Sequence, residues 1–131
     1  MIDQIYTYFR FEMIYLWLNV GVIPFWLMLI FFPQTKICKI FVSSVFPLSI
    51  LSCVYIYLIL EIFKSGFNFI DTFNLYLGLD DLIVLFAEKN FAILIWTHFL
   101  AINFFCGSWI TKDSQKYFIT KTLTFFPLVF L

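Results

Sequence analysis

His98 and Asn103 stand in the middle of an otherwise apolar segment that runs from Phe91 to Asp113. An imidazole at that position could donate or accept one proton near neutral pH, or contact a polar group of a substrate. Ionisable groups at membrane depth are rare without a role. We therefore predict that His98 is the candidate catalytic residue. The alternative is a structural hydrogen bond between helices.

Asn19 lies in the middle of another apolar run and is the natural partner of Asn103. A buried polar group without a partner costs roughly 2–7 kcal/mol, so each amide needs one. The simplest expectation is a hydrogen-bonded bridge between the two amides. Trp109 is placed as an interface anchor would be.

The sequence lacks the residues that haem, metal sites and several common catalytic motifs need. A single histidine cannot supply bis-histidine haem, and Cys38, Cys53 and Cys106 have no metal-binding spacing. The sequence contains no Ser/His/Asp order, glycine-rich phosphate loop or HExxH motif. The net charge is zero, which gives no indication of a nucleic-acid partner. We expect no metal, no cofactor and no nucleic acid.

The composition is that of an all-α, polytopic membrane protein. Of the 131 residues, 63% are apolar and 12% are charged, against about 45–50% and about 25% in soluble domains. A hydrocarbon core about 30 Å thick takes about 20 helical residues. We expect one transmembrane domain over residues 1–131, embedded in a lipid bilayer. Its four transmembrane helices, the fourth incomplete, are expected at about 13–32, 40–63, 91–110 and 120–131.

The long connection, residues 64–90, contains an apolar pattern of its own. Leu79, Leu82, Ile83 and Phe86 follow the spacing i, i+3, i+4, i+7, which predicts a short amphipathic helix. Such a helix lies flat at the membrane interface when its apolar face enters the lipid. An ordered loop packed on the helix ends is the alternative.

Lysines gather in the turns at 34–39 and 111–121, which four spans would place on one side of the membrane. These turns hold five lysines and one acidic residue, Asp113. The opposite side holds three cations and seven carboxylates. The excess of cations predicts that the basic turns are cytoplasmic or stromal. The lysines are Lys36, Lys39, Lys112, Lys116 and Lys121.

The central segment also carries a recognisable pattern, W-x-H-F-L-A-x-N-x-F-x-G-x-W-I-x-x-D, from Trp96 to Asp113. It resembles the signature of the abscisic-acid-deficient-4-like family of small membrane proteins. The first apolar run is similar to the family's opening helix at Asn19, Pro24, Trp26, Leu27 and Pro33. The resemblance covers about Leu18 to Leu131.

Two departures from the family pattern matter. The family usually has Asp where this chain has Asn103, which removes a carboxylate from any acid–base role. The family also continues beyond the position of Pro127 through a second half of the last helix. We therefore expect this chain to be truncated at its C-terminus relative to the family.

The family's best-known members are implicated in neoxanthin synthesis from violaxanthin in the chloroplast. The resemblance implies a protein that acts on, or assists modification of, a carotenoid-like isoprenoid in a bacterial inner membrane or a plastid or thylakoid membrane. An isomerase of this type would need a proton donor and acceptor, a role suited to His98, and no redox cofactor. In this reading Asn19 and Asn103 would hold an end-group hydroxyl, and Trp96 and Trp109 would line a groove for the polyene. The alternative is a non-catalytic scaffold or accessory subunit that binds a membrane-protein partner.

Overall fold

The regular structure is entirely helical in the part of the chain that the computed structural model describes, residues 10–66 and 78–131. The expected all-α class is confirmed. The first part of the long connection, residues 67–77, lies outside the described residues. The elements are α2 (Phe11–Phe31), the π-helical turn η1 (Cys38–Val42), α3 (Phe46–Lys64), α5 (Leu79–Ala87), α6 (Lys89–Lys116) and α7 (Lys121–Phe130).

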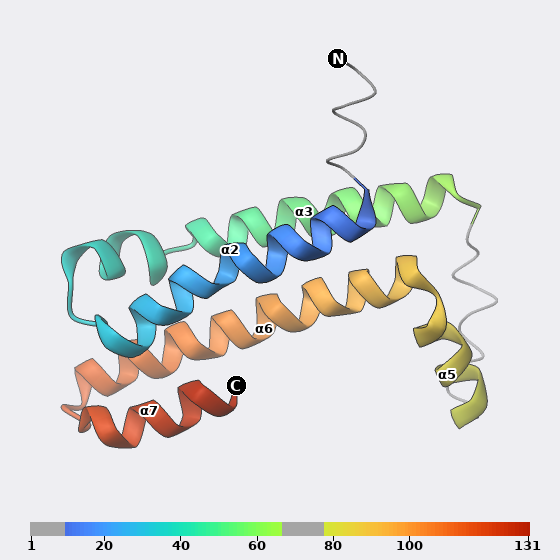
Figure 1. Ribbon diagram of the computed structural model, residues 1–131. Coiled ribbons are helices and arrows are strands. Elements are labelled where there is room, and N and C mark those ends of the chain that lie inside the picture. The colour runs from blue at the N-terminus through green and yellow to red at the C-terminus, as the bar shows by residue number, and fades with distance from the viewer. Residues whose placement is uncertain (1–9, 67–77) are drawn as a thin grey trace, which may run out of the picture.

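Helix α6 is the centre of the bundle and packs against α2, α3, α5 and α7. Helices α2 and α6 run in the same direction, whereas α3 and α7 run in the opposite one (Figure 1). By contrast, α2 and α3 make few direct contacts with each other. Phe104 of α6 is almost fully buried, and its ring meets those of Phe25 and Trp26 edge-on. The core therefore lies along α6, and the space between α2 and α3 is not closed by helix contact.

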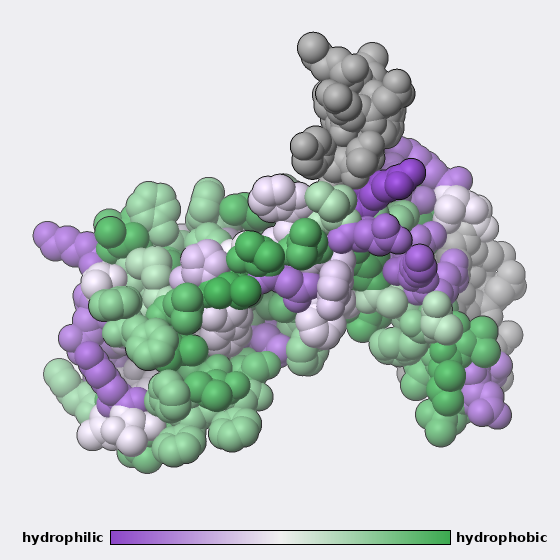
Figure 2. Space-filling model, in the orientation of Figure 1, coloured by the Kyte–Doolittle hydropathy of each residue, from purple (hydrophilic) through white to green (hydrophobic). Residues whose placement is uncertain are grey.

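Within the described residues, three stretches are long and apolar enough to cross a membrane: Phe11–Phe31, Cys38–Lys64 and Lys89–Lys116. Apolar side chains cover most of the middle of the bundle on the face shown in Figure 2, and polar residues gather toward its ends. Both features are consistent with a membrane protein. The predicted count of four spans is not confirmed, because α7 has ten residues and so covers only about 15 Å.

The second predicted helix, 40–63, differs from the observed structure at its start. The chain leaves the π-helical turn at Ser43, and α3 begins at Phe46 with Pro47 in its first turn. Proline has no N–H to donate and is tolerated in the first turn, where helix N–H groups have no partner. Ser44 supports the break, since its hydroxyl accepts the N–H of Phe46 and donates to the carbonyl of Phe41.

The third predicted helix, 91–110, is longer than expected, since α6 continues through the polar residues to Lys116. The predicted connection 111–121 is therefore mostly helical. Ser114 donates its hydroxyl proton to the carbonyl of Thr111 within this extension. The remaining turn is short, and Phe118 takes a left-handed backbone conformation there, with φ 54°.

Helix α5 occupies the predicted amphipathic segment, but its buried residue is Leu85. Leu79, Ile83 and Phe86 of the predicted apolar stripe are exposed. Phe86 meets Phe91 at the start of α6 edge-on, at 5.7 Å between ring centroids. The location of α5 at a membrane interface stays a prediction.

Candidate functional site

His98 lies on the side of α6 that faces α3. Its ring is exposed and tilted against that of Tyr55, with 5.7 Å between the centroids. The five hollows described below, all within residues 10–66 and 78–131, are lined without His98. The predicted catalytic residue thus has an aromatic neighbour that carries a phenol.

Asn19 and Trp96, two of the predicted binding residues, contact each other. The indole N–H of Trp96 donates to Oδ1 of Asn19 at 3.2 Å. The Asn19 amide donates in turn to the carbonyl of Tyr15, one turn earlier in α2. The hydrogen bond between Trp96 and Asn19 joins α6 to α2 and satisfies two polar groups among apolar side chains.

The expected bridge between Asn19 and Asn103 is wrong. Asn103 donates to the main-chain oxygen of Leu131 at 2.8 Å, whereas Asn19 pairs with Trp96. The two asparagines lie on α2 and α6, yet each finds a nearer partner. Asn103 therefore ties α7 to α6, and none of His98, Asn19 and Asn103 lines any of the five hollows described.

Trp96 and Trp109 line two separate hollows rather than one groove. Trp96 borders a hollow of about 370 Å³ between α2 and α6, where Glu12 and Lys89 form an exposed ion pair. Trp109 borders one of about 320 Å³ between α6 and α7. The two indoles are 13 residues apart on α6, which is about 20 Å along the helix.

An apolar groove that the sequence reasoning missed lies between α2 and α3. Two hollows, of about 560 and 210 Å³, share Trp17, Leu18 and Ile50 in their walls and so join end to end. The first extends from these residues toward Ile14 and Tyr57, the second toward Phe25 and Pro47. We call this joined space the α2–α3 groove. From Ile14 to Phe25 it follows α2 for about 16 Å.

The lining explains why the groove is open. Gly21 leaves a gap in the wall of α2, because a Cβ atom added there would have no neighbour within 4 Å. Phe104 of α6 lines the second hollow, of about 210 Å³, which we call the inner hollow. Trp17 stands at the surface and is 61% exposed. The groove is therefore long and apolar, is backed by Phe104 of α6 at the hollow of about 210 Å³, and is open at the surface where Trp17 stands.

The groove's residues carry little polar chemistry. Cys53 and Tyr57 are the titratable side chains among the described residues that line it. Within the described residues, no group of three His, Cys, Asp or Glu side chains could hold a metal ion. The arrangement suits an elongated apolar molecule held by contact.

A comparison with known protein families shows to which of them the chain belongs. The sequence profile of the ABA DEFICIENT 4-like family matches residues 13–131. The chain belongs to the ABA DEFICIENT 4-like family. This confirms the resemblance found in the central segment. No significant match to a curated protein or to a solved structure was found.

The structure of this ABA DEFICIENT 4-like chain gives packing roles to residues of the pattern. A Cβ atom added at Gly107 would lie 2.9 Å from Cη2 of Trp26 and 3.4 Å from a methyl carbon of Leu128. Gly107 therefore lets the Trp26 ring of α2 and Leu128 of α7 lie directly against α6. Asn19 of the first apolar run and Trp96 of the pattern form the hydrogen bond between α2 and α6.

Proposed function

We propose that this protein binds a carotenoid-like isoprenoid in the α2–α3 groove and holds it for a membrane enzyme that modifies it. The observation that carries the proposal is the groove itself, an open apolar channel backed by Phe104 and widened at Gly21. A polyene is long, narrow and rigid, so a preformed linear groove costs little conformational entropy on binding. Family membership supports this ligand class, because the family resemblance implies xanthophyll modification.

The groove favours binding over catalysis at that place. Its described lining lacks a carboxylate, a histidine and a lysine. An isomerisation of an epoxide needs a proton donor and acceptor near the reacting carbon. The reaction would then be contributed by a partner enzyme, and the Phe-rich surface of the bundle provides apolar area for such a partner.

A direct isomerase role for His98 is the second candidate. The observation in its favour is the contact with Tyr55, which places two side chains that can carry a proton beside each other on α6 and α3. In this candidate the ligand's end group would reach the exposed imidazole from the lipid. His98 would exchange the proton and Tyr55 would orient the ring.

Pigment analysis of a violaxanthin-producing host separates the two candidates. The host would express the wild type, His98→Ala, Tyr55→Phe or no protein, with each variant shown to be inserted in the membrane. We expect violaxanthin to co-purify with all three proteins to the same extent. If a new xanthophyll is formed by the wild type but not by His98→Ala, the isomerase role is supported and the binding proposal is contradicted. Absence of pigment from every purified protein would contradict both.

A further inference from the structure

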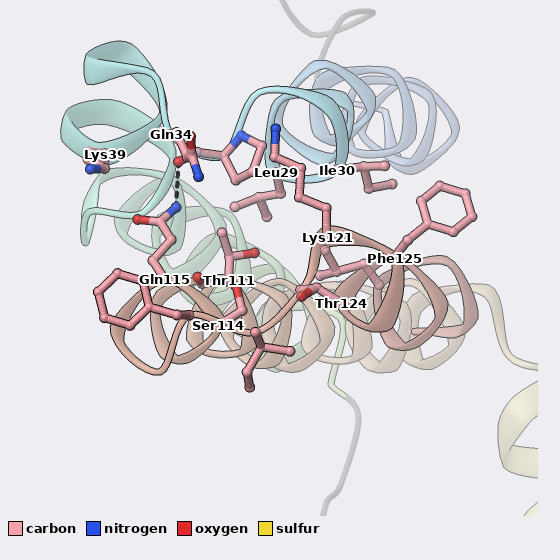
Figure 3. Close-up of a pocket in the computed structure, with 14 residues that line it drawn as sticks. Leu29, Ile30, Gln34, Lys39, Thr111, Ser114, Gln115, Lys121, Thr124 and Phe125 are labelled. Atoms are coloured by element: carbon pink, nitrogen blue, oxygen red, sulfur yellow. Dashed lines mark hydrogen bonds between the residues drawn. The ribbon is translucent and has the colours of Figure 1, made fainter.

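A fifth hollow, of about 500 Å³, lies at the end of the bundle where the basic residues gather. The C-terminal end of α2, the last turns of α6 and the first turns of α7 surround it (Figure 3). Gln115 donates to the carbonyl of Pro33 at 2.7 Å across one side of it. Gln34, Lys39 and Lys121 line it together, so the two basic turns do share one end of the bundle.

The charged side chains that line this hollow are all cationic. Lys39 and Lys121 line it, and none of its described lining residues is acidic. The side chain of Lys121 extends from the first turn of α7 toward the C-terminal end of α2 (Figure 3). Within the described residues, neither ammonium has a carboxylate within ion-pair distance. The hollow therefore offers two uncompensated cations to an occupant.

Three hydroxyl groups and one amide of the hollow already donate to main-chain carbonyls. Thr111 and Thr124 donate their hydroxyl protons to carbonyls of their own helices, those of Gly107 and Thr120. Ser114 and Gln115 likewise donate to main-chain carbonyls. The two ammonium groups are thus the strongest donors left, and ammonium groups bind phosphate oxygens as point charges.

The wall toward the membrane interior is apolar. It consists of Leu29 and Ile30 of α2 and of Phe125 and Leu128 of α7. A free phosphate ion would gain nothing from this wall, whereas a lipid places its phosphate and its hydrocarbon chains in adjacent regions. The lining therefore matches a molecule that is anionic at one end and apolar at the other.

We propose that this hollow binds the phosphate headgroup of an anionic membrane lipid, with Lys39 and Lys121 as the phosphate-binding residues. The site is separate from the α2–α3 groove and does not depend on the function proposed for it. It would fix the basic end of the bundle at the headgroup layer. Anionic lipids attract lysines at the membrane surface with about 1 kcal/mol each, which is about fivefold in affinity.

The test measures lipid binding to the purified full chain by native mass spectrometry, with phosphatidylglycerol and phosphatidylcholine as probes. Lys39→Gln and Lys121→Gln are each expected to weaken phosphatidylglycerol binding about fivefold, and the double variant about 30-fold. Phosphatidylcholine binding should change little. Melting temperatures without added lipid establish that the variants are folded.

A matched control uses Lys36→Gln with Lys112→Gln, two lysines of the same end that do not line the hollow. This pair should keep most of the affinity for phosphatidylglycerol. An equal loss in both double variants would show a diffuse attraction and overturn the site. Inorganic phosphate is the second arm. If it displaced phosphatidylglycerol at millimolar concentration, the hollow would be an ion site and not a lipid site.

Discussion

Gly21→Phe is expected to lower the affinity of the protein for violaxanthin by about fivefold to about 150-fold, since overpacking a filled site costs about 1–3 kcal/mol. The phenyl ring would enter the inner hollow of the α2–α3 groove, where Gly21 now leaves open space. Quenching of the fluorescence of the four tryptophans by the polyene would measure binding, and one of them, Trp17, lines both hollows. The melting temperature should not fall.

Gly21→Ala is the matched control for this variant. Its methyl group meets nothing within 4 Å, and alanine is favoured over glycine inside a helix by about 1 kcal/mol. We expect the affinity of Gly21→Ala for violaxanthin to stay within about twofold of the wild-type value. This change is much smaller than the tenfold that corresponds to about 1.4 kcal/mol. Unchanged binding in Gly21→Phe would place the ligand elsewhere on the molecule.

Gly107→Ala is expected to destabilise the bundle by about 2 kcal/mol, within the usual range for overpacking a filled site. The new methyl group would lie 2.9 and 3.0 Å from two ring carbons of Trp26, closer than carbon atoms can approach without movement. The rigid indole must turn or α2 must move away from α6. Thermal unfolding in detergent, followed by circular dichroism, would measure the loss.

The double variant Gly107→Ala with Trp26→Leu provides the internal control. A smaller, flexible side chain removes the ring carbons that the methyl group meets, so this pair should be destabilised by less than the sum of the single changes. Gly21→Ala serves as the control for the loss of a glycine in a membrane helix. A Gly107→Ala protein as stable as the wild type would show that α2 does not pack closely on α6.

The positions of the long helices could be predicted because runs of about twenty apolar residues have one stable arrangement in a bilayer. Their ends were less predictable. The second helix begins later than its apolar run because Pro47 fits only in the first turn. Helix α6 extends past Ile110 because Thr111 to Lys116 hold no glycine or proline to stop it.

The candidate site was only partly predictable, because partners depend on the rotation of each helix about its axis. Asn19 and Trp96 were both predicted as binding residues, but the sequence did not indicate that they bond to each other. The α2–α3 groove was missed for the same reason. A signal was present in Trp17 and Gly21, which stand one turn apart on α2, and a large residue beside a gap is typical of a groove wall.

The most direct test of the central claim, that an isoprenoid lies in the α2–α3 groove, uses the three cysteines of the chain. Cys53 is exposed and lines the groove, whereas Cys106 on α6 lines none of the five described hollows and Cys38 is buried. The rate of alkylation at each thiol would be measured by mass spectrometry in detergent, with and without bound violaxanthin. The account predicts that violaxanthin slows the reaction of Cys53 and leaves that of Cys106 unchanged. Equal rates at Cys53 with and without the bound pigment would contradict it.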